Sequence, residues 1–168
     1  GIATPDGAVL YRVRTVADDP KAAWIFLRNL EAERKTSTVN GWDVAVPAHD
    51  VAILPWNVPL ANGWRLAFSA TEPLYQADGL LVLKAGLPDM AILVAPDGQR
   101  HEVAWDALGE TVWTLRQAGG LRVLLLGARC ADTLWIEADG TLVWGPSAKL
   151  EDGRYCFGPE GGPLHHLA

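Results

Sequence analysis

The stretch RKTSTVNGWDVAV, residues 34–46, places an Asn-Gly pair between two short runs rich in β-branched and apolar residues. Asn40 and Gly41 both tolerate the positive φ angles that the tightest hairpin turns require. The flanking runs, residues 34–39 and 42–46, have the length and composition of β-strands. The stretch therefore predicts a β-hairpin, and similar stretches recur along the whole chain.

Six further Asp-Gly or Asn-Gly pairs punctuate the sequence, and most of the seven lie between runs of strand length. The pairs are Asp6-Gly7, Asn40-Gly41, Asn62-Gly63, Asp78-Gly79, Asp97-Gly98, Asp139-Gly140 and Asp152-Gly153. The runs are residues 8–15, 22–30, 34–39, 42–46, 51–54, 64–69, 80–84, 91–94, 101–105, 111–117, 121–126, 133–137, 141–144 and 154–157. Helical signals are confined to residues 128–135 and 106–110, which are short. The pattern predicts an all-β, antiparallel β-sandwich-like domain with very little helix.

Several runs indicate where they lie in the fold. Residues 24–27 (WIFL) and 123–126 (VLLL) are apolar on both faces, so we expect them to be buried and central. In residues 9–14 apolar residues alternate with Arg12 and Arg14, which places Val9, Tyr11 and Val13 on the core face. The three prolines in residues 47–59 favour an edge or interrupted strand.

The 168 residues fit a single domain, residues 1–168, in which a boundary between two packed β subdomains near residues 118–121 stays open. A complete (β/α)₈ barrel, which needs about 250 residues, is excluded. The net charge of −6 argues against a nucleic-acid partner. The apolar runs are far shorter than the roughly 18 residues of a membrane span. Residues 1–7 lack an initiator Met and the features of a signal peptide, which favours a piece of a longer chain.

A search for chemistry finds no paired Cys or His with metal-ligand spacing, no nucleophilic serine elbow and no phosphate-binding loop. No two glutamates stand out as the facing pair that glycoside hydrolysis requires. We therefore expect no catalytic, metal-binding or cofactor-binding residue. Glu72, before Pro73 at the end of an apolar strand, is expected to bind turn amides, with a binding role as the alternative. Cys130 and Cys156 could form a disulfide or remain two buried thiols.

The chain has eight tryptophans, a high number for its length. Flat aromatic rings of this kind either fill the cores of β proteins or stack on sugars. Four are flanked by apolar strand residues and are expected in the core: Trp24, Trp105, Trp113 and Trp135. Trp42 follows the Asn-Gly turn, and Trp56 lies between Pro55 and Asn57. We expect Trp42 and Trp56 to be partly exposed, and they are the candidates for contact with a sugar or a neighbouring domain.

Five segments, in this order along roughly residues 8–150, resemble a region of glycoside hydrolase family 35 β-galactosidases. They are NGWDVAVP at residues 40–47, HDVAILP at 49–55, WRLAFSATE at 64–72, VLLLGARCADTLW at 123–135 and GTLVWGP at 140–146. The third ends in Ser-Ala-Thr-Glu where the family has a Ser-Thr-Ala-Glu-like sequence. The agreement in order is more specific than any one segment.

The resemblance implies a non-catalytic β-sheet domain that follows the catalytic barrel of a multidomain β-galactosidase and packs against it. Both catalytic glutamates of that family lie on the barrel, so the resemblance transfers no catalytic residue to this chain. It names the barrel and galactosides as partners and is compatible with a secreted or periplasmic location. We expect the interdomain contact at an exposed apolar edge near residues 55–60. The alternatives are an autonomous carbohydrate-binding module and a small enzyme with its own concave site.

Overall fold

The computed structural model describes residues 9–145, 148–151, 154–157 and 164–168. These residues form strands, one 3₁₀ turn and one α-helix of five residues, which confirms the all-β fold with very little helix. The elements are β1 (Leu10–Val16), β2 (Asp19–Arg28), β3 (Lys35–Val39), β4 (Trp42–Val46), β5 (Val51–Pro59), η1 (Ala61–Gly63), β6 (Arg65–Ser69), β7 (Pro73–Ala77), β8 (Leu80–Lys84), β9 (Asp89–Val94), β10 (Arg100–Trp105), β11 (Trp113–Ala118), β12 (Leu121–Leu126), α1 (Ala128–Asp132), β13 (Trp135–Ile136), β14 (Leu142–Trp144), β15 (Ala148–Glu151), β16 (Arg154–Phe157) and β17 (His165–Leu167).

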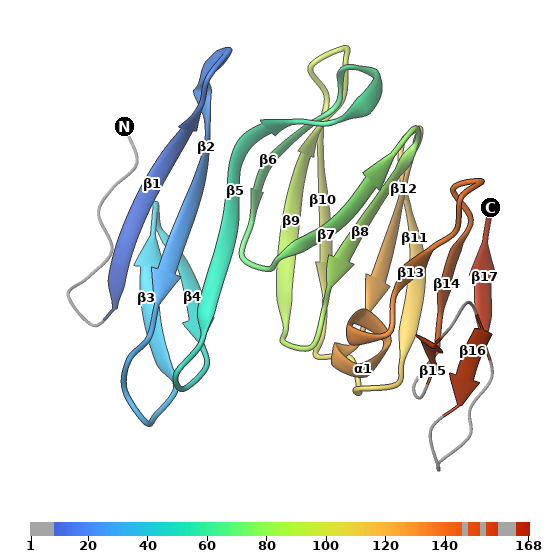
Figure 1. The fold of residues 1–168 in the computed structure, drawn as a ribbon. Helices are drawn as coiled ribbons and strands as arrows, with labels where there is room; N and C mark the ends of the chain where they lie inside the picture. The colour runs from blue at the N-terminus through green and yellow to red at the C-terminus, as the bar shows by residue number, and fades with distance from the viewer. Residues whose placement is uncertain (1–8, 146–147, 152–153, 158–163) are drawn as a thin grey trace.

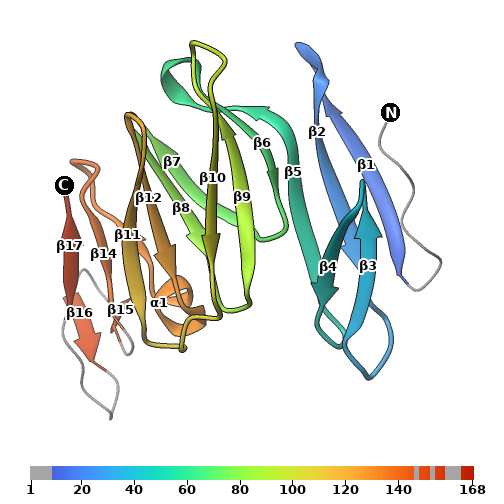
Figure 2. The same cartoon turned by 180° about the vertical axis from the view of Figure 1, so that it is seen from behind.

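The strands form a six-stranded sheet in the order β1-β2-β5-β6-β9-β10 and a four-stranded sheet in the order β11-β12-β8-β7. A three-stranded sheet, β13-β14-β17, and the pairs β3-β4 and β15-β16 complete the described part of the chain. Figures 1 and 2 show these sheets following one another from β1 at one end to β17 at the other. Among the described strands, only β8 and β12 pair in parallel. The fold is therefore mostly, but not wholly, antiparallel.

The first hydrophobic core lies between the β3-β4 hairpin and one half of the six-stranded sheet. Val39, Val44 and Val46 of the hairpin are fully buried against Ile25 and Leu27 of β2. The turn of this hairpin has φ angles of 48° at Asn40 and 84° at Gly41, as the sequence of residues 34–46 predicts.

The second core lies between the other half of the six-stranded sheet and the four-stranded sheet. The third covers the opposite face of the four-stranded sheet, where Cys130 of α1 and Trp144 of β14 pack on Leu124 and Leu126. Residues 123–126 are therefore buried on both faces of a central strand, as predicted. Residues 24–27 are predicted to be buried on both faces as well, but only one face is buried completely, because Trp24 and Phe26 are half-buried.

The six-stranded sheet exchanges its core-facing side at a bulge in β6. Leu66 is paired with Leu93 and belongs to the second core, whereas Phe68 is paired with Ile92 and belongs to the first. Adjacent residues of β9 point to opposite faces of the sheet. Because of the register shift between Leu66 and Phe68, these two side chains of β6 therefore also point to opposite faces. One sheet thereby contributes to two cores on its two faces.

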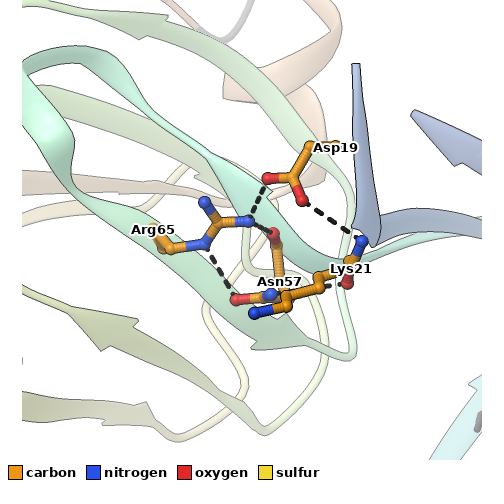
Figure 3. A network of polar contacts seen from close by, with 4 residues as sticks. All are labelled: Asp19, Lys21, Asn57 and Arg65. Atoms are coloured by element: carbon orange, nitrogen blue, oxygen red, sulfur yellow. Dashed lines mark hydrogen bonds and ion pairs between the residues drawn. The ribbon is translucent and has the colours of Figure 1, made fainter. Parts of the chain in front are cut away.

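Arg65 anchors this region, as Figure 3 shows. Asn57, on the neighbouring strand β5, has a φ of 50°, a conformation that non-glycine residues adopt uncommonly. The Arg65 guanidinium donates to the Asn57 side-chain oxygen at 2.9 Å and to its carbonyl oxygen at 2.6 Å. It also pairs with the carboxylate of Asp19, at the start of β2, at 2.5 Å. Three strands are joined by one side chain.

The strand with the prolines lies inside the six-stranded sheet, between β2 and β6, so the expected edge position is wrong. Pro55 is paired with β2 and precedes the first residue paired with β6, and Pro59 is paired with β6 alone. The missing N–H groups fall where β5 has a neighbour on one side only. Residues 55–60 are consequently no exposed apolar edge, because Pro55 and Val58 are buried.

Other expectations also need correction. Residues 106–110 form no helical turn, and β7, β15 and β17 lie outside the runs that the turn pairs delimit. Tyr11, on the edge strand β1, is exposed, and in this region it is Val9, directly before β1, that belongs to the first core. Residues 118–121 form the turn of the β11-β12 hairpin, and the possible subdomain boundary there stays a prediction.

Candidate functional site

The structure brings the two candidate tryptophans, Trp42 and Trp56, to the same phenylalanine. The Trp42 ring stacks on Phe68 with 5.5 Å between ring centroids, and Trp56 meets Phe68 edge to face at 6.1 Å. Both tryptophans are half-buried, as expected, and pack against the first core. Their rings support Phe68 at the point where β6 changes face.

The four tryptophans expected in the core divide into two groups. Trp105 is buried and its Nε1 donates to the Leu87 carbonyl oxygen at 2.9 Å, and Trp24 is half-buried. Trp113 and Trp135 are 37% and 42% exposed, so their expected core positions are wrong. They lie on β11 and β13, which are edge strands. Apolar neighbours in the sequence do not reveal that a strand lies at an edge.

Trp135 borders an apolar hollow of about 340 Å³ on the third core. We call it the Trp135 hollow, and its lining consists of Leu74, Ala131, Leu134, Trp135 and Ile136. These residues come from β7, the segment around α1, and β13. The hollow thus joins chain segments that are about sixty residues apart, and every side chain lining it is apolar.

A larger cleft, of about 540 Å³, lies among the β3-β4 hairpin, β5, the turn after β6 and the segment between β8 and β9. We call it the acidic cleft. Its lining includes four carboxylates, Asp43, Asp50, Glu72 and Asp89, and two basic side chains, Arg34 and Lys84. Apolar residues such as Val51, Ile53, Leu54, Leu87 and Pro88 form much of the remainder.

Glu72 is exposed at this cleft and does not hold the turn that precedes it. Ser69 Oγ accepts a hydrogen bond from the Thr71 amide at 3.2 Å and donates to the Thr71 carbonyl oxygen at 3.0 Å. The Thr71 hydroxyl donates to the Lys84 carbonyl oxygen. The buried Ser69 hydroxyl therefore has the role expected of the Glu72 carboxylate, which is left to face the cleft.

The carboxylate of Asp89 is partly withdrawn from water at the wall of the cleft. It lies at the start of β9, and its Oδ1 accepts a hydrogen bond from the Met90 amide at 2.7 Å. Burial raises the pKa of Asp89 from 3.8 to about 6, because the charged form loses hydration that one backbone amide only partly replaces. The nearby Lys84 ammonium forms an ion pair with Asp132 at 3.5 Å.

Asn29, which the sequence reading overlooks, holds two walls of the acidic cleft together. This buried side chain donates to the carbonyl oxygens of Glu33 at 2.7 Å, Val46 at 3.2 Å and Pro47 at 3.0 Å. Its Oδ1 accepts a hydrogen bond from the Glu31 amide at 2.9 Å. The loop before β3 is thereby tied to the end of β4. No motif marks Asn29, because its partners are main-chain atoms up to 18 residues away.

Cys130 is a free thiol buried in the third core, and burial raises its pKa. The side chain of Cys156 lies outside the described residues. Within the described parts of the chain, no three His, Cys, Asp or Glu side chains are grouped so that they could hold a metal ion. The carboxylates of the acidic cleft thus line different walls rather than converge on one point.

Comparison with protein-family models finds no match for this chain, and comparison with curated protein sequences finds none either. No helix in the described residues has both the length and the apolar character needed to cross a membrane.

Proposed function

We propose that this chain is a non-catalytic accessory domain of a multidomain glycoside hydrolase related to the family 35 β-galactosidases, and that it packs against the catalytic barrel of the parent protein. The five sequence segments in family order support this reading, and the all-β fold agrees with it. The observation that carries it is the Trp135 hollow.

An exposed tryptophan beside a wholly apolar hollow is typical of the centre of a protein interface, where aromatic anchors fill apolar pockets. Trp135 and Ile136 are both more than two-fifths exposed although they belong to a strand. Leaving a contiguous apolar patch in water is unfavourable, so such patches usually have a partner. The Trp135 hollow replaces residues 55–60 as the surface where we place the contact with the barrel.

A carbohydrate-binding module is the second candidate, because an exposed tryptophan can also stack on a sugar ring. A sugar site additionally needs polar side chains beside the ring, to bind the hydroxyl groups. The lining of the Trp135 hollow offers only apolar side chains. At the other two candidates, Trp42 and Trp56, the rings are engaged with Phe68. Packing against protein is therefore favoured over binding of galactosides.

The test is to co-express the chain with the catalytic barrel of its parent protein and to measure co-purification. We expect Trp135→Ser to abolish the association, because it removes the central apolar anchor. Leu115→Ser is the control, since Leu115 is 40% exposed on β11 and does not line the hollow. Retained association in Trp135→Ser would contradict the placement of the interface.

Two measurements on the chain alone separate the rival functions. Titration with galactose and galacto-oligosaccharides should leave the tryptophan fluorescence unchanged. A saturable shift that Trp135→Ser abolishes would favour a carbohydrate-binding module instead. Release of nitrophenol from a nitrophenyl galactoside should stay at background. Activity that a single Glu→Gln variant such as Glu72→Gln removes would identify a small enzyme.

A further inference from the structure

The acidic cleft is a second surface with features of a binding site, distinct from the Trp135 hollow. Its volume of about 540 Å³ is within the range of ligand-binding clefts. Two apolar residues of its lining, Val51 and Leu87, are 43% and 39% exposed, so the cleft offers apolar surface to a partner. The half-buried Ile53 extends this apolar surface along β5.

The charges of the cleft are unbalanced. Four carboxylates line it against two basic groups, and one of the two, Lys84, is already paired with Asp132 outside the lining. Asp50 and Asp89 each accept a hydrogen bond from the following main-chain amide, and Asp43 accepts one from the Thr38 hydroxyl. These are neutral donors. The cleft therefore has a net negative charge that a cationic group would complement.

We propose that the acidic cleft docks a short segment of a partner protein in which a lysine or arginine is flanked by apolar side chains. The cationic group lies against the Asp89 carboxylate, and the flanking side chains cover Leu87 and Ile53. The described residues form four ion pairs, and Asp89 belongs to none of them. Nucleic acid is disfavoured by the sign of the charge, and a metal ion by the dispersed carboxylates.

The partial loss of hydration at the Asp89 carboxylate supports a cationic occupant. Its carboxylate is desolvated by the surrounding protein without a compensating cation, which is the reason its pKa is raised. A bound ammonium or guanidinium group would stabilise the charged form and relieve that cost. Val51 and Leu87 would lose contact with water in the same step. The inference concerns a different surface from the Trp135 hollow, so it does not depend on the proposed function.

The test is an NMR titration of the ¹⁵N-labelled chain with an acetylated, amidated pentapeptide that has an arginine between two leucines. We expect saturable shifts of the amide signals around Ile53, Leu87 and Asp89. A control peptide with glutamine in place of arginine should bind roughly three- to fivefold more weakly, the effect of losing one partly buried ion pair. Asp89→Asn should weaken binding of the arginine peptide by a similar factor.

Two further variants keep the result specific. Asp18→Asn removes the same charge at an exposed residue outside the cleft and should leave binding unchanged. Leu87→Ser should weaken both peptides equally, because it removes apolar contact and no charge. Equal affinity for the arginine and glutamine peptides would overturn the proposal, as would shifts confined to other surfaces or the lack of saturable shifts at millimolar peptide. None of these outcomes depends on the barrel or on Trp135.

Discussion

The guanidinium of Arg65 on β6 lies 2.5 Å from the carboxylate of Asp19 at the start of β2, although the strand β5 separates β2 from β6 in the sheet. The same guanidinium holds the carbonyl oxygen of Asn57 on that intervening strand. The hydrogen bond from Arg65 is the main reason that the pKa of Asp19 is lowered. The contact secures the region in which the sheet exchanges its core-facing side.

Arg65→Met should destabilise the chain by about 1–2 kcal/mol, because the two hydrogen bonds to Asn57 are lost and its strained conformation is no longer supported. The free energy of unfolding in urea measures this. The lowered pKa of Asp19 implies stability that is present above the ordinary carboxylate pKa and is lost as the pH falls through the lower, folded value. The difference between wild type and Arg65→Met should therefore shrink in acid. A difference that grows on acidification would contradict this account.

Asp89→Asn should stabilise the isolated chain at neutral pH. The raised pKa of Asp89 means that its contribution to stability is greatest below 3.8 and is lost as the pH rises through about 6. The rise from 3.8 to about 6 corresponds to at most roughly 3 kcal/mol, less for a half-buried group. Asparagine keeps an oxygen for the Met90 amide and carries no charge.

Thermal unfolding of Asp89→Asn and wild type at pH 4 and pH 7 checks this prediction. The melting temperatures should be closer at pH 4, where the aspartate of the folded chain is protonated, and the variant should melt higher at pH 7. The same substitution is expected to weaken binding at the acidic cleft. Greater stability with weaker binding is characteristic of a residue retained for function.

Asn29→Ala should destabilise the chain by roughly 2–4 kcal/mol, because it takes the side-chain donor away from the main-chain carbonyl oxygens of Glu33, Val46 and Pro47. Gln76→Ala, which shortens an exposed amide side chain on β7, is the control. Chemical denaturation gives the free energies, and amide hydrogen exchange locates the effect. Exchange should become faster for the Glu31 amide, which binds Asn29 Oδ1. An unchanged exchange rate there would show that the loop is held by other contacts.

Phe68→Ala should cost about 3–5 kcal/mol, the usual range for a buried aromatic residue. It should also change the fluorescence of Trp42 and Trp56, because both rings rest on Phe68. Phe68→Leu keeps most of the volume and separates the two effects, with a smaller loss of stability and a similar loss of ring contact. Fluorescence that stays the same in both variants would contradict the packing of these tryptophans.

Part of the candidate sites could be found in the sequence and part could not. The sequence points to Glu72 alone, because Asp43, Asp50 and Asp89 join it in the acidic cleft only where the β3-β4 hairpin, β5 and the start of β9 meet. Trp135 and Trp113 have apolar neighbours in the sequence and were expected in the core. Their exposure follows from edge positions, which depend on how distant strands pair.

Several local elements follow from the sequence alone. The Asn40-Gly41 turn and its flanking strands depend on backbone preferences of a few adjacent residues, and a run such as residues 123–126 is apolar enough to require burial on both faces. The parallel pairing of β8 with β12, the interior position of β5 and the bulge between Leu66 and Phe68 depend on long-range packing and cannot be read from any local stretch of sequence. These features arise from contacts between segments far apart in the chain, where the burial of apolar faces outweighs local propensity.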